Sequence, residues 1–112
     1  MSNNVQKLIE ERRQLLEELS TLDHMLYGSW LERYSTCSRE NCKCHRGELH
    51  GPRYYLVVNE NGHQKQKYIG VGQKEAALAG VVQGKRMLEI VDAITQINLQ
   101  LMKEGAFDDG NK

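Results

Sequence analysis

Apolar residues repeat at helical spacing near both ends of this 112-residue chain. Near the N-terminus the steps alternate between three and four residues, and the positions are Val5, Leu8, Arg12, Leu15, Leu19, Leu22 and Leu26. This spacing places one stripe along a helix, and it predicts a helix over residues 4–27, with Gly28 in the left-handed position that often follows a helix. Such a helix is about 36 Å long, so it needs a second helix to cover its stripe.

Arg12 is the polar member of this stripe. We expect its side chain to pair with an acidic residue across a helical interface, or to extend its charged head to the edge of that interface. Both alternatives are structural roles rather than functional ones.

A second apolar stripe with the same spacing lies near the C-terminus, at Met87, Ile90, Ile94, Ile97 and Leu101. It predicts helical structure over residues 73–104. Gly84 leaves open either one long helix or two helices with a break beside it, because glycine in a helix interior costs about 1 kcal/mol relative to alanine. Residues 105–112 show no apolar period, and we expect a mobile tail there.

Between the predicted helices, three stretches predict strands. Residues 53–58 are rich in aromatic and β-branched residues, whereas residues 30–35 and 64–69 alternate apolar or long side chains with polar ones. The dipeptide Asn61-Gly62 stands between the second and third stretches, and Asn-Gly is a strong signal for a tight hairpin turn. The three stretches therefore predict an antiparallel sheet within residues 28–70.

Together these patterns predict an α+β fold. We expect long N- and C-terminal helices to form an antiparallel hairpin or bundle, with a three-stranded antiparallel β module inserted between them. The length of the chain is that of one domain, residues 1–112, with only a modest hydrophobic core. Two helices leave part of their stripes uncovered, so we also expect a homodimer through the helices.

The chain's three cysteines lie close together in the predicted β module. With a following histidine they form the pattern Cys-x4-Cys-x-Cys-x5-His, at Cys37, Cys42, Cys44 and His50. Zinc commonly takes four sulfur or nitrogen ligands in a tetrahedron, and three cysteines with one histidine are one of its structural sets. The alternative fourth ligand is His45, but it adjoins Cys44, and His50 has a longer loop with which to reach the metal. The spacing therefore predicts a zinc-stapled module.

Reduced, unliganded thiols are the simpler interpretation of these cysteines. An odd number excludes complete pairing in disulfides, and buried free cysteine often acts as a small apolar filler. Here, however, the neighbouring residues are polar or charged, which argues against burial of these cysteines in an apolar core. A set of four protein ligands leaves no open position for catalysis, so we predict that the protein is not an enzyme.

The charge of the chain is balanced overall but not locally. Fifteen basic residues offset fifteen acidic ones, whereas residues 29–74 carry eight basic and four acidic residues. Basic side chains bind phosphates and aromatic rings can stack on bases, so this module is a candidate nucleic-acid-binding surface, with DNA favoured. The candidate contact residues are Arg33, Arg53, Lys65, Lys67, Tyr54 and Tyr55.

Two other interpretations of this module stay open. Lysine and arginine on a sheet surface also discourage edge-to-edge aggregation, and tyrosines also pack a sheet against helices. The alternative function is therefore a zinc-stabilised adaptor that binds a protein partner and no nucleic acid. The sequence has no long apolar run and no signal-like N-terminus, so we expect no membrane contact and a cytoplasmic location.

The cysteine region also resembles a known family. The segments that carry the resemblance are Gly28-Ser-Trp-Leu-Glu-Arg-Tyr, the three-cysteine motif, Gly47-Glu-Leu-His-Gly-Pro-Arg-Tyr-Tyr-Leu56 and Tyr68-Ile69, which together span roughly residues 28–70. They resemble a family of small prokaryotic proteins of uncharacterised function, many of them found near mobile genetic elements. The resemblance implies the same three cysteines and His50 as metal ligands, flanking helices, and a link to mobile elements. It implies no reaction. Arg53 stands where the family usually has an aromatic residue.

Overall fold

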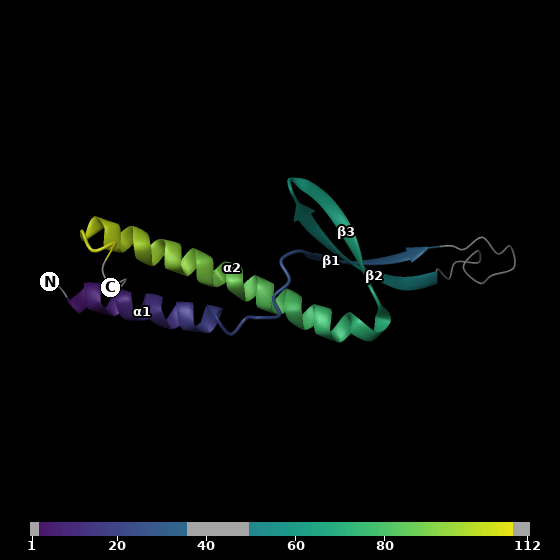
Figure 1. The fold of residues 1–112 in the computed structure, drawn as a ribbon, viewed down its shortest axis with the longest axis horizontal. Coiled ribbons are helices and arrows are strands. Elements are labelled where there is room, and N and C mark those ends of the chain that lie inside the picture. Colours follow the sequence, from purple (N-terminus) through teal and green to yellow (C-terminus); the bar gives the residue numbers. More distant parts are fainter. Residues whose placement is uncertain (1–2, 36–49, 109–112) are drawn as a thin grey trace, which may run out of the picture. The chain divides into compact units, whose positions relative to one another are not determined.

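The computed structural model describes residues 3–35 and 50–108. Along the chain these residues form α1 (Asn3–Leu19), β1 (Ser29–Ser35), β2 (His50–Glu60), β3 (His63–Ile69), the short 3-10 helix η2 (Val71–Gln73) and α2 (Lys74–Lys103) (Figure 1). The fold is α+β, with two α-helices and a three-stranded antiparallel sheet in the described part of the chain. None of the described helices is both long enough and apolar enough to cross a membrane.

The chain divides into two compact units. The first, which we call the helical unit, comprises Met1–Met25 and Gln83–Lys112, and the second, which we call the sheet unit, comprises Leu26–Val82. Helix α2 contributes residues to both units because it runs from Lys74 to Lys103 without interruption. Of the two alternatives for this region, the single helix is the one observed.

Helix α1 ends at Leu19 rather than at the predicted residue 27. The reason lies in the two hydroxyl residues that follow. The Ser20 hydroxyl donates to the Glu17 carbonyl at 2.6 Å, and the Thr21 hydroxyl donates to the Glu18 carbonyl at 2.7 Å. Such local side-chain bonds satisfy the last carbonyls of a helix and compete with its continuation.

The core of the helical unit joins α1 to the C-terminal part of α2. Its fully packed members are Val5, Ile97, Leu101 and Ala106, with Leu8, Ile9 and Leu15 partly buried against them. The two predicted apolar stripes therefore supply most of this core, and Ala106 comes from the segment after α2. An ion pair also joins the two helices. The Arg86 guanidinium donates to both carboxylate oxygens of Glu18, at 2.6 and 2.7 Å, and these hydrogen bonds lower the pKa of the Glu18 carboxyl.

Arg12 is buried in this unit, as expected for a stripe position, and it makes hydrogen bonds across the interface between the helices. Its guanidinium donates to the side-chain oxygen of Asn98 at 2.7 Å and to the Phe107 carbonyl at 3.3 Å. Arg12 therefore links α1 to both α2 and the segment after it.

Residues 105–108 differ from the mobile tail that the sequence predicted. Gly105 adopts φ 71°, the Gly105 amide donates to the Met102 carbonyl at 3.1 Å, and the Ala106 amide donates to the Leu101 carbonyl at 2.8 Å. This is a Schellman motif, in which the residue after the left-handed glycine packs back on the last turn. Ala106 accordingly lies in the core. Residues 109–112 are outside the described part.

The sheet has the order β1-β2-β3, with both neighbouring pairs antiparallel. The turn between β2 and β3 is the predicted Asn61-Gly62, with φ of 53° and 82° respectively. Positive φ at both central residues is the requirement of a type I′ turn, which suits the twist of a hairpin. This turn sets a regular register from Glu60 opposite His63 to Tyr54 opposite Ile69.

Gly28 has a different role from the helix cap that the sequence predicted. It lies where a Cβ atom would be 2.5 Å from the Val57 carbonyl oxygen and 3.0 Å from the Val58 side chain. Only glycine permits so close an approach of this segment to β2. Two residues earlier, the Leu26 amide donates to the Gly80 carbonyl at 2.9 Å, which ties the start of the sheet unit to α2.

Candidate nucleic-acid interface

The register of the sheet assigns its side chains to two faces. Directly opposite residues in an antiparallel pair lie on the same face, and successive residues of a strand alternate between faces. Arg33 lies opposite Arg53, and Tyr55 lies opposite both Leu31 and Tyr68. The face that these residues share, which we call the arginine face, comprises Ser29, Leu31, Arg33, Arg53, Tyr55, Val57, Asn59, Gln64, Gln66 and Tyr68.

The other side, which we call the tryptophan face, carries the core of the sheet unit. Trp30 stacks on Tyr54 with ring centroids 5.5 Å apart, and Tyr54 and Leu56 are buried. The first residue of α2, Lys74, places its ammonium 5.0 Å from the centroid of the Tyr54 ring. Hydrogen bonding to Tyr54 raises the pKa of Lys74. The tryptophan face is therefore the side on which α2 begins.

Charge is distributed unequally between the two faces. The acidic residues of the described strands are Glu32 and Glu60, and the register assigns both to the tryptophan face. Glu60 pairs with Lys67 of the same face at 2.9 Å. On the arginine face, Arg33 and Arg53 are exposed, and none of the described strand residues there is acidic. Its charge is therefore purely positive.

The aromatic residues of the arginine face are already engaged with one another. The Arg33 guanidinium lies over the Tyr55 ring, 5.5 Å from its centroid, and Tyr68 meets the same ring edge-on at a centroid distance of 5.8 Å. Tyr55 thus orients Arg33, and its ring is half-buried. Tyr68 remains 63% exposed.

The structure separates the six predicted contact residues into two groups. Arg33, Arg53 and Tyr55 come together on the arginine face. Tyr54 is instead buried and stacked on Trp30, so it serves the core of the unit. Lys65 and Lys67 lie on the opposite face from the arginines.

The predicted contact residues leave out the three residues that β3 contributes to the arginine face, Gln64, Gln66 and Tyr68. All three are exposed and follow one another at every second position of β3. The signal was present, because the Asn61-Gly62 turn fixes which residues of β3 oppose those of β2. The sequence does not show which face of the sheet any one strand residue occupies. Once one residue is assigned to a face, strand alternation and register assign all the others.

The candidate metal ligands Cys37, Cys42 and Cys44, and the alternative His45, lie outside the described residues. His50 is described through its backbone, as the first residue of β2, where it pairs with Ser35 at the end of β1. Elsewhere in residues 3–35 and 50–108 there is no group of three or more histidine, cysteine or acidic residues that could hold a metal.

Comparison with known proteins gives one match. Residues 5–78, which are more than half of the chain, match the family described as Domain of unknown function (DUF6788). The chain belongs to the DUF6788 family. No curated protein and no solved structure matches it. The DUF6788 region includes every residue of the arginine face and all the candidate metal ligands, and it ends near the start of α2.

Proposed function

We propose that this DUF6788 protein binds DNA through the arginine face of its sheet, as a zinc-stabilised homodimer. The observation that carries the proposal is the direct opposition of Arg33 and Arg53 on a face whose described residues include no acidic side chain. Like charges placed directly opposite one another destabilise a sheet, so this pair is disfavoured unless a partner neutralises it. A polyanion supplies that neutralisation.

Phosphate is the partner that best suits these groups. The planar guanidinium donates two parallel hydrogen bonds to a phosphate, which makes arginine a strong phosphate ligand. The chain as a whole has no net charge, so the attraction depends on the local surplus in residues 29–74. Glu32 and Glu60, on the other face, do not oppose a phosphate backbone laid across the arginine face.

Zinc would hold the loop between β1 and β2 in this proposal. The pairing of Ser35 with His50 supports it, because paired strand residues lie about 5 Å apart and Cys37 is only two positions beyond Ser35. In sequence, Cys37 and His50 thus lie close to the two paired strand ends, which supports the proposal that they bind one ion. A fully ligated Cys3His site is structural, and we propose binding rather than catalysis. Three thiol ligands also suit the reducing cytoplasm.

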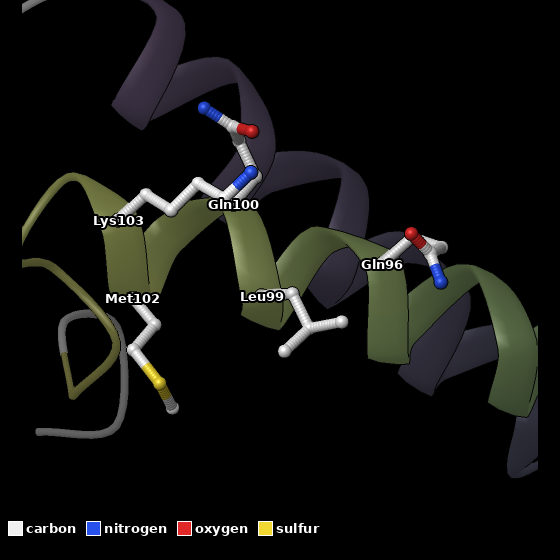
Figure 2. Close-up of a pocket in the computed structure, with 5 residues that line it drawn as sticks. All are labelled: Gln96, Leu99, Gln100, Met102 and Lys103. Atoms are coloured by element: carbon white, nitrogen blue, oxygen red, sulfur yellow. The ribbon is translucent and has the colours of Figure 1, made fainter.

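The proposed dimer forms through the helices. Contacts between α1 and α2 run in opposite order along the two helices, with Arg12 on Asn98 and Glu18 on Arg86, which supports an antiparallel hairpin. Figure 2 shows Leu99 and Met102 projecting together from one side of α2. The exposed apolar residues of this outer stripe are Leu88 (41%), Val91 (44%), Leu99 (48%) and Met102 (54%). Two hairpins joined there would make a four-helix bundle.

The same outer stripe favours the second candidate function, an adaptor that binds another protein and no nucleic acid. Contiguous exposed apolar residues on a helix mark protein contacts, whether with a second copy or with a different chain. The two functions differ in what happens at the arginine face, which an adaptor does not use.

Duplex DNA binding by the purified protein tests the proposal. We expect a complex at moderate salt whose association constant falls steeply as salt rises, because phosphate contacts release counterions. Native mass spectrometry with and without a short duplex reports the complex, the zinc content and the oligomeric state together. A zinc-loaded dimer that ignores DNA would leave the adaptor as the better account.

The dimer makes a separate prediction about the outer stripe. Replacing Leu99 and Met102 with glutamate places charges inside the proposed interface, and we expect a monomer by light scattering, with an unchanged helical circular dichroism signal. Gln96→Glu is the matched control, because Gln96 is exposed beside the stripe (Figure 2). If the double variant kept the mass of the wild-type protein, the interface would lie elsewhere.

A further inference from the structure

We propose that the arginine face reads base pairs in the major groove of duplex DNA, with Gln64 and Gln66 of β3 as the side chains that contact base edges. This inference rests on the proposed function, and it specifies the form of DNA and the residues that would discriminate sequence. It goes beyond the phosphate contacts assigned to the two arginines.

The first support is the chemical order of groups along the arginine face. Arg33 and Arg53 form one end, Tyr55 and Tyr68 the middle, and the other end, near the hairpin turn, carries amides. There Gln64 lies opposite Asn59, and Gln66 lies opposite Val57. A glutamine amide both donates and accepts, and it can bond to the adenine edge in the major groove through two hydrogen bonds.

Both glutamines are available for such contacts. Their side chains are exposed, and neither side-chain amide makes a hydrogen bond to another residue of the described chain. They share a face with the arginines because they pair with Asn59 and Val57, which lie on the same face of β2 as Arg53. A DNA duplex bound by Arg33 and Arg53 at one end of this face can therefore contact Gln64 and Gln66 at the other end.

The dimensions of the sheet suit a major groove. The outer strands of a three-stranded sheet lie about 9.6 Å apart, and the major groove of B-DNA is about 12 Å wide. From Arg53 to Asn59 a strand advances about 20 Å, which corresponds to about six base pairs at roughly 3.4 Å each. The arginines at one end can then hold the flanking phosphates while the amides reach bases further along the groove.

Single-stranded nucleic acid suits this face less well. Binding to single strands relies on aromatic rings open to stacking with bases. On the arginine face, however, the Tyr55 ring is covered by the Arg33 guanidinium and met at its side by Tyr68. Tyr54 is buried on the other face. Among the described residues of the arginine face, Tyr68 alone offers an open ring, which is too little for a row of stacked bases.

The test is selection from a duplex library with a random core, followed by sequencing and by affinity measurements on the enriched site and on a scrambled duplex. We expect the wild-type protein to enrich a short motif with A·T pairs at defined positions. In the double variant Gln64→Ala and Gln66→Ala, those preferences should disappear and affinity for the enriched site should fall roughly tenfold or more. Affinity for the scrambled duplex should change by less than about twofold, since phosphate contacts remain.

Gln96→Ala is the matched control, because it removes an exposed glutamine from α2 and leaves the sheet intact. It should keep the wild-type motif. Three results would overturn the inference: DNA binding without any base preference, a motif unchanged in the double variant, or tighter binding to one strand of the enriched site than to its duplex. Absence of DNA binding in any form would refute the proposed function itself, which keeps the two failures distinct.

Discussion

Replacing Cys42 with serine is expected to release the bound zinc and to lower the melting temperature of the sheet unit sharply. Structural zinc contributes about 10–16 kcal/mol of binding free energy in small zinc domains, which is as much as the whole stability of a typical domain. Among the described residues, the buried apolar side chains of the sheet unit are few: Tyr54, Leu56, Ala77 and Val81. A core of this size contributes little free energy of unfolding by itself, so the sheet unit has low stability once the metal is lost.

The measurement combines metal analysis of the purified variant with thermal unfolding followed through the fluorescence of Trp30, the chain's single tryptophan, which stacks on Tyr54 in the sheet unit. Ser38→Ala is the matched control, because it alters the same loop without removing a predicted ligand. If Cys42→Ser kept its zinc and its melting temperature, the zinc hypothesis would be wrong.

The same assay distinguishes the two candidates for the fourth metal ligand, His50 and His45. The pairing of His50 with Ser35 favours His50 over His45, because it brings His50 next to the strand that leads to Cys37. We therefore expect His50→Ala to lose zinc and His45→Ala to retain it. The reverse result would transfer the ligand role to His45 and leave the three cysteines in place.

The sequence predicted most of the fold because its strongest signals are local. The apolar stripes of the two helices and the Asn61-Gly62 turn each depend on residues within a few positions of one another. The end of α1 was wrong for a related reason: the stripe continues through Leu22, which is buried, although Ser20 and Thr21 have already ended the helix. A periodic pattern marks the buried positions, and these need not all be helical.

The burial of Ala106 and the role of Gly28 could not be predicted in this way. Ala106 packs because Gly105 reverses the chain, and an alanine after a glycine gives no apolar period to detect. Gly28 is required by the closeness of Val57, a contact between residues far apart in the sequence. Both depend on tertiary structure, which a local pattern does not contain.

The candidate interface was predicted in composition but not in arrangement. Counting basic and aromatic residues found Arg33, Arg53 and Tyr55, and it also found Lys65 and Lys67 on the opposite face. A count cannot separate the two sets, because a face is defined by strand parity and register. The same parity identifies Gln64 and Gln66, which carry no charge and so escaped a search for basic residues.

Removing both arginines gives the largest expected effect on binding. In the double variant Arg33→Ala and Arg53→Ala, affinity for duplex DNA should fall about a hundredfold, at roughly tenfold for each arginine. The slope of log K against log salt should become shallower by about two, because two phosphate contacts are lost. Fluorescence anisotropy with a labelled duplex, repeated over a range of salt concentrations, measures both quantities.

The fold should tolerate this change, which is what makes the prediction specific. The two arginines are directly opposite and repel one another, so their removal relieves a like-charge pair, although Arg33 also gives up its contact with Tyr55. We therefore expect a melting temperature close to that of the wild-type protein. The matched control is Lys65→Ala with Lys67→Ala, which removes the same charge from the tryptophan face. If both double variants weakened DNA binding equally, the attraction would come from the charge of the whole module rather than from one face, because a specific interface must distinguish the two sides of the sheet.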